Sequence, residues 1–276
     1  MRLRERAWRL FASEYNAATH TWSEGGERSP MYVVTPLGAL VNRLFFVGVL
    51  TEAEALGGGS MQRARVSDPT DTWVIYAGQY QPIPAQTLAS LKPPALIAVV
   101  GKVHVYSPEE GVVYPSVRPE IVREVGPELR DYWILEASGE TLKRAEATSE
   151  ALKMSPPEAP KLAALGYDEQ LSKGVVMALN EYGQVDVDPY AGMVKDVLRW
   201  ALSTPTKEGA EVEGDEGQAL EIIRSLDEGN GAPWDGVVAE AAKHKMDEEH
   251  IEVVVSALLA KGILYEPTLG YLRVSE

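Results

Sequence analysis

The fold of this chain is decided by three segments: NRLFFVGVLTE (residues 42–52), MQRARVSDPTDTWVIYAG (61–78) and LIAVVGKVHVY (96–106). β-Branched and aromatic residues dominate them, and glycines and an Asp-Pro pair separate them, which is typical of strands joined by turns. Gly48 suits the sharp bend that lets one strand serve both sheets of a small barrel. A short helix at 82–94, a fourth strand at 95–106 and a short last strand at 112–117 complete a predicted five-stranded β-barrel.

Two of these strands divide into two faces, because side chains alternate along an extended chain. Arg63 and Arg65 lie on the face opposite the apolar residues that follow each of them. Lys102, His104 and Tyr106 share one face of the last segment, opposite two valines. Cations that neutralise phosphates, beside rings that stack on unpaired bases, suit single-stranded nucleic acid. An ordinary small barrel with a basic outer face is an equally open interpretation.

Composition limits the class of protein. The 276 residues contain no cysteine and four histidines, and 24% of them are charged. We therefore expect a globular protein of about two domains, without disulfides, metal or other cofactor. The N-terminus lacks a signal-peptide pattern and no apolar run is long enough to span a bilayer, so we expect a cytoplasmic, nucleoid-associated protein without membrane contact.

The net charge of −15 is distributed unevenly along the chain. Residues 31–120 carry six Lys/Arg against seven Asp/Glu, whereas residues 207–276 carry six against sixteen. The barrel region is thus close to neutral and has room for a local basic face. The last quarter is too acidic to approach a phosphate backbone readily.

The regions on either side of the barrel read as mostly helical. Residues 2–18 are predicted to form an amphipathic helix that plugs the barrel or, less commonly for such a segment, docks on a partner subunit, followed by a polar connector that ends at residue 30. After the barrel (31–125), a helix is predicted over 126–154, within an association segment that we place at 126–155. Pro156 begins a linker in the region 156–206, which also holds two helices, at 168–182 and 189–202.

Residues 207–276 show the pattern of a winged helix, with three helices and a hairpin. The expected recognition helix carries Asp247, Glu248, Glu249 and Glu252 where a reader of duplex DNA would need cations. Protein recognition is therefore the favoured role for this domain. We find no phosphate-binding loop and no nucleophile motif, so we do not expect an enzyme.

The segments YVVTPLGALVNRLFFVGVLTE, ARVSDPT, VIYAGQYQP and GKVHVY resemble the OB-fold subunits of the archaeal replication protein A family. The resemblance covers roughly residues 5–155 and implies a mixed β and α fold, with an OB-fold barrel, helices and a C-terminal winged helix. It also implies stacking on bases by one aromatic residue of the third strand, where Tyr76 fits better than Trp73, and by Tyr106. The candidate nucleic-acid contacts are Arg43, Phe45, Arg63, Arg65, Trp73, Tyr76, Lys102, His104 and Tyr106.

In that family the helix after the barrel bundles with sister subunits, and the winged helix recruits other proteins. The resemblance therefore implies partner contacts at Tyr132, Trp133, Leu142 and Leu152, although this helix could instead pack on its own barrel. The expected function is single-stranded DNA binding within a replication protein A-like complex in replication, repair and recombination. The alternatives are a replication or transcription scaffold that makes only protein contacts, and a winged-helix regulator of duplex DNA.

Overall fold

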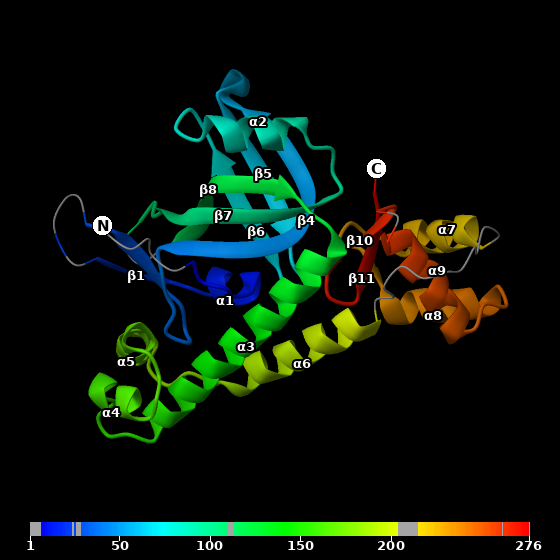
Figure 1. The fold of residues 1–276 in the computed structure, drawn as a ribbon. Coiled ribbons are helices and arrows are strands. Elements are labelled where there is room, and N and C mark those ends of the chain that lie inside the picture. Colours follow the sequence, from blue (N-terminus) through cyan, green and yellow to red (C-terminus); the bar gives the residue numbers. More distant parts are fainter. Residues whose placement is uncertain are drawn as a thin grey trace.

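The computed structural model describes residues 7–23, 25, 29–109, 113–203, 215–260 and 262–275. Its centre is a closed barrel in the order β4-β5-β6-β8-β7 (Figure 1). The strands are β4 Arg43–Leu56, β5 Met61–Ser67, β6 Thr72–Ala77, β7 Ala95–Tyr106 and β8 Tyr114–Glu124. The helix α2, Pro82–Ser90, connects β6 to β7, and the short 3-10 turn η1, Gly57–Gly59, connects β4 to β5. A five-stranded barrel of this kind is an OB fold, which confirms the predicted barrel.

Two glycines let strands approach closely in the barrel. A Cβ on Gly48 would lie 2.5 Å from the Ser67 carbonyl oxygen, and one on Gly101 would lie 2.5 Å from a Val117 methyl carbon. Real Cβ atoms do not come this close, so both positions require glycine. At Gly48, where the sequence led us to expect a bend, strands β4 and β5 approach each other closely. Their pairing shifts register just beyond this glycine, between Leu50 and Glu52.

The last strand is longer than the sequence predicts. β8 continues to Glu124, whereas the expected strand ended at residue 117. Pro115 and Pro119 lie within β8 and lack the N–H that a strand donates, which hid its second half. A register shift between Val100 and Gly101 of β7 accommodates the irregularity, and pairing with β7 resumes beyond it.

The predicted helix over residues 2–18 is wrong within the described residues. Only α1, Ala12–Asn16, is helical there, and residues 7–11 run extended. Trp8 pairs with β4: its N–H donates to the Arg43 oxygen at 2.9 Å, and the Phe45 N–H donates to the Trp8 oxygen at 2.9 Å. Residues 7–16 nevertheless pack into the barrel core, because Trp8, Leu10, Phe11 and Tyr15 are buried.

A small antiparallel sheet precedes the barrel, and only its first strand lies in the stretch predicted as a connector. It contains β1 His20–Ser23, β2 Met31–Val34 and β3 Leu40–Val41, in the order β1-β2-β3. The side-chain amide of Asn42 donates to the Met31 oxygen at 2.7 Å and ties this sheet to the start of β4.

Long helices lie against one side of the barrel. α3, Pro127–Leu152, packs along α6, Asp188–Ser203, and leads from the barrel to α4, Ala159–Ala164, and α5, Glu169–Tyr182 (Figure 1). α3, α5 and α6 were predicted, whereas α4 lies in the stretch predicted as linker. Within α3, Arg144 is fully buried and bonds both carboxylate oxygens of the equally buried Glu14, at 3.0 and 2.6 Å.

The residues from 215 to 275, here named the C-terminal unit, have a separate hydrophobic core. The unit contains α7 Glu216–Leu226, β9 Ala232–Pro233, α8 Trp234–Lys243, α9 Glu248–Ala260, β10 Leu264–Thr268 and β11 Tyr271–Val274. Its three strands form an antiparallel sheet in the order β10-β11-β9. The Asp247 carboxylate accepts from the His250 N–H at 2.9 Å and so caps α9.

Candidate nucleic-acid interface

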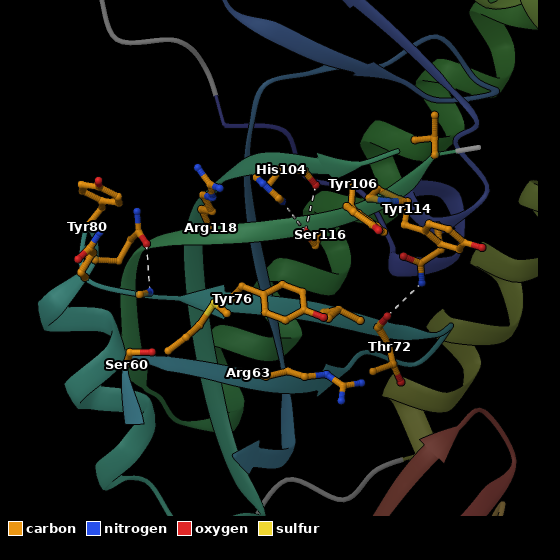
Figure 2. Close-up of a pocket in the computed structure, with 18 residues that line it drawn as sticks. Ser60, Arg63, Thr72, Tyr76, Tyr80, His104, Tyr106, Tyr114, Ser116 and Arg118 are labelled. Atoms are coloured by element: carbon orange, nitrogen blue, oxygen red, sulfur yellow. Dashed lines mark hydrogen bonds between the residues drawn. The ribbon is translucent and has the colours of Figure 1, made fainter. Parts of the chain in front are cut away.

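A groove of about 1070 Å³ crosses the outer face of β5, β6, β8 and β7 (Figure 2). Although the chain carries a net charge of −15, none of the described residues that line this groove is an aspartate or a glutamate. Its main polar and aromatic residues are Arg63, Tyr76, Tyr80, His104, Tyr106, Tyr114 and Arg118. The groove is therefore a local surface on which a polyanion meets no lining carboxylate.

The two strands β7 and β8 arrange their outward side chains as a ladder of three pairs, of which every member except Lys102 lines the groove. Lys102 pairs in register with Arg118, His104 with Ser116 and Tyr106 with Tyr114. Successive pairs are two residues apart, which corresponds to roughly 7 Å along a strand. Cations therefore stand at one end of the ladder and two aromatic rings at the other.

The aromatic end of the ladder is open to solvent. Tyr106 and Tyr114 are 61% and 58% exposed, and their rings stack with centroids 6.5 Å apart and an interplanar angle of 25°. Figure 2 shows them on neighbouring strands, across the hollow from Tyr76. Tyr80, at the rim beside α2, is 81% exposed. Exposed rings of this kind offer π-faces to unpaired bases.

The predicted cations differ in how far they are already neutralised. Arg63 bonds Glu54 at 2.8 Å, Arg65 bonds Glu52 at 3.1 Å, and Arg43 bonds Glu120 at 2.6 Å. These glutamates stand on the outer surface beside their partners. Lys102 and Arg118 are exposed, and neither has an ion-pair partner in the part of the chain that the structure describes. Arg118 is therefore the groove cation most available to a phosphate.

His104 lies between the cationic and aromatic ends of the ladder. Its Nδ1 is 3.3 Å from the Ser116 hydroxyl, which in turn donates to the His104 backbone oxygen at 3.1 Å. Partial burial lowers the pKa of His104, and the positive charge of Arg118 lowers it further. The ring is thus held in its neutral form near pH 7 and serves as a hydrogen-bonding group.

Five of the predicted contacts do not line this groove: Arg43, Phe45, Arg65, Trp73 and Lys102. Trp73 is fully buried, because it stacks on Phe46 at 4.3 Å and its indole N–H donates to Asp68 at 2.9 Å, so its inclusion was wrong. Phe45 is half-buried beneath the Arg9 guanidinium, which lies 5.3 Å from the ring centroid, and it does not line the groove.

Among the main polar and aromatic residues of the groove, sequence reasoning missed Tyr80, Tyr114 and Arg118. Tyr114 and Arg118 belong to β8, whose extent the sequence underestimated. Alternation from the buried Val117 places both on the outer face: Tyr114 already lies within the predicted strand at 112–117, whereas Arg118 lies just beyond its predicted end. Tyr80 lies in the turn before α2, where strand periodicity carries no signal.

The predicted partner residues on α3 divide into exposed and buried ones. Tyr132, Leu142 and Leu152 are exposed, and so is Leu135, which was not predicted. Trp133 is fully buried, because its indole N–H donates to the Phe45 oxygen at 3.0 Å and its ring packs against Phe11. Its assignment as a partner contact was therefore wrong: at this residue α3 packs on its own barrel.

The acidic side chains of α9 also lie on the surface. Asp247, Glu248, Glu249 and Glu252 are all exposed. Among the described residues, no group of His, Cys, Asp and Glu side chains is arranged to hold a metal ion. None of the described helices combines the length and the apolar character needed to cross a bilayer.

Neither the protein-family models nor the curated protein sequences include a match to this chain. Among solved structures, it is similar to a chain of a replication protein A heterotrimer bound to single-stranded DNA, with 13% identity and a TM-score of 0.38 over 51% of this chain and 98% of that one. A single-stranded DNA-binding protein from Mycoplasma pneumoniae matches with 15% identity and a TM-score of 0.24, over 30% of this chain and 93% of that one. The second such protein of Mycobacterium smegmatis matches with 19% identity and a TM-score of 0.26, over 30% and 86%. All three TM-scores lie below 0.5, so the assignment of the barrel rests on its own strands.

Proposed function

We propose that this protein binds single-stranded DNA in the groove on β5, β6, β7 and β8. The observation that carries the proposal is a groove on a strongly acidic chain whose described lining includes exposed tyrosines and no carboxylate, and whose Arg118 has no ion-pair partner among the described residues. OB folds bind oligonucleotides on the face of their second and third strands and on the loops beside it. The groove occupies the corresponding face, which supports the proposal by analogy of fold.

The ladder on β7 and β8 suggests how a strand is held. A phosphate contacts Arg118 and Lys102, and bases stack on Tyr106 and Tyr114 at the other end. Stacking does not depend on which base is present, so binding is expected to tolerate most sequences. Titration of the purified protein with labelled single-stranded and duplex oligonucleotides tests this directly. Equal or tighter binding of duplex DNA would contradict the proposal.

The salt dependence of binding tests the role of Arg118. Arg118→Ala is expected to weaken single-strand binding and to lower the slope of log affinity against log salt by about one, because one phosphate contact is lost. Arg65→Ala is the matched control, since Arg65 already bonds Glu52 at 3.1 Å and does not line the groove. An unchanged slope for Arg118→Ala would make this arginine structural.

We also propose that the protein is one subunit of a replication protein A-like complex in replication, repair and recombination. Exposed Tyr132, Leu135 and Leu142 recur along one face of α3 and support a helical partner there. Leu142→Glu is expected to release this partner while the barrel stays folded, as seen by co-purification and circular dichroism. Light scattering that shows a monomer in native extract would count against subunit assembly.

The C-terminal unit is proposed to act as a winged helix that recruits replication or repair proteins. The exposed carboxylates of α9 oppose contact with phosphates and suit a protein partner. Ending the chain at about residue 210 is expected to leave single-strand affinity unchanged or slightly raised, and to abolish capture of that partner. A loss of tenfold or more in DNA affinity would favour a nucleic-acid role for this unit.

A further inference from the structure

The C-terminal unit contacts the rest of the molecule at a buried carboxyl group. β10 lies beside the first turns of α3 and the last turn of α6 (Figure 1). Glu266 of β10 points into this junction, where the Trp200 indole of α6 and the Gly270 backbone N–H hydrogen-bond its carboxyl group. Its Oε2 is buried and has no hydrogen-bond partner among the described residues. An ionised carboxylate in this position would be incompletely solvated.

The surrounding charges do not supply Glu266 with a cation of its own. Arg130 of α3 is the nearby cation, but it bonds Asp131 at 2.8 Å and lies over the Trp200 ring at 5.3 Å. Its charge is therefore shared between two carboxyl groups.

The remaining charged groups at this junction are also engaged with one another. Arg273 of β11 bonds Asp227 at 3.1 Å and interacts with the Tyr265 hydroxyl. On the barrel, Glu52 lies near Tyr265 and bonds Arg65 at 3.1 Å. A neutral carboxyl group fits this environment better than a carboxylate does.

We propose that Glu266 is a proton-controlled latch: the C-terminal unit docks on α3 and α6 while this carboxyl is neutral and is released when it ionises. The unit can separate without loss of its fold because its hydrophobic core is its own, distinct from the core of the barrel. When Glu266 ionises, the junction between the C-terminal unit and the two helices opens, and the carboxylate becomes exposed to water. The latch acts independently of whether the groove binds DNA.

The direction of the pH dependence follows from the pKa of Glu266. Burial raises this pKa from its ordinary 4.5 to about 7 in the docked state. The docked state thus holds the proton over a range in which the released state has lost it, so the docking constant is largest below about pH 4.5, falls as the pH rises from there to about 7, and levels off at higher pH. Between pH 6 and pH 8.5 the docking constant is expected to fall about tenfold.

The absence of cysteine from the chain makes this measurable in the full-length protein. Cysteines introduced at the exposed positions Gln86 of α2 and Ala242 of α8 carry a donor and an acceptor dye. Energy transfer is expected to be higher at pH 6 than at pH 8.5 and to level off above about pH 7, because the two units separate as Glu266 ionises. Constant transfer from pH 6 to 8.5 would overturn the proposal.

Substitutions assign the effect to the latch. Glu266→Gln keeps the shape but cannot ionise, so its energy transfer should stay high at both pH values. Glu248→Gln, the same change at an exposed position of α9, should behave as the unsubstituted protein. Retention of the pH response in Glu266→Gln would overturn the proposal.

A second variant tests the same group even if Glu266→Gln fails to fold. The Trp200 hydrogen bond favours the ionised carboxylate in the docked state, so Trp200→Phe should weaken docking more at pH 8.5 than at pH 6 and should enlarge the fall in energy transfer between them. A pH response that is unchanged or smaller in Trp200→Phe would contradict the assignment to Glu266.

Discussion

Replacing Tyr106 and Tyr114 together by alanine is expected to reduce single-strand affinity at least about thirtyfold, because each lost stack costs about 1–3 kcal/mol. Both rings are exposed at the same end of the groove and stack 6.5 Å apart, so a strand that uses one ring also lies within reach of the other. Each single variant should show part of the loss. Fluorescence anisotropy with a labelled oligothymidine at fixed salt measures all three variants.

The controls separate binding from folding. Removal of exposed side chains should change the free energy of unfolding by less than about 0.5 kcal/mol, which thermal melts can verify. Tyr271→Ala removes a 41% exposed tyrosine of the C-terminal unit and should leave affinity unchanged. If the double variant binds as tightly as the unsubstituted protein, the groove is not the nucleic-acid site.

Arg144→Ala is expected to lower the free energy of unfolding by about 3–5 kcal/mol, because it leaves the buried Glu14 without its cation. Arg144 donates to both Glu14 oxygens, at 3.0 and 2.6 Å, and both side chains are fully buried. Thr35 adds a further hydrogen bond to Glu14 at 2.9 Å. The pair therefore joins residues 7–16, which pack into the barrel core, to helix α3.

Urea unfolding followed by circular dichroism measures this loss. Arg199→Ala is the matched control: its ion pair with Asp196 spans 3.6 Å at the surface, and its removal should cost less than about 1 kcal/mol. The double variant Glu14→Leu/Arg144→Met should recover much of the stability, since no unpaired charge stays buried. A cost below about 1 kcal/mol for Arg144→Ala would mean that the junction relaxes and hydrates Glu14.

Local patterns in the sequence were enough to determine the main elements. The predicted strand over 95–106 is β7, and the predicted helix over 126–154 contains α3. In both, one short-range period dominates: alternation in the strand and three- to four-residue spacing in the helix. The same alternation identified the outward set Lys102, His104 and Tyr106, because neighbouring side chains of a strand must face opposite ways.

Only the tertiary structure decided which of the predicted contact residues are exposed and free of ion pairs, and so available to bind a nucleic acid. Alternation places Trp73 and Tyr76 on opposite faces, but burial of Trp73 depends on Phe46 and Asp68, which other parts of the chain bring to it. The cations Arg63 and Arg65 are neutralised because the register of β4 and β5 pairs them with Glu54 and Glu52. A single sequence does not specify that register.

Long-range pairing also overrode local preference at both ends of the barrel. The spacing of apolar residues near the N-terminus favours a helix. In the structure the Trp8 backbone instead hydrogen-bonds to β4 and its ring is buried. Closure of the barrel then sets β6 and β7 on either side of β8, which brings Tyr76, Tyr106 and Tyr114 around one groove. The sequence by itself therefore determined the elements and their faces, since both follow from local periodicity. The groove depended on closure of the barrel, which brings together residues that are far apart in the chain.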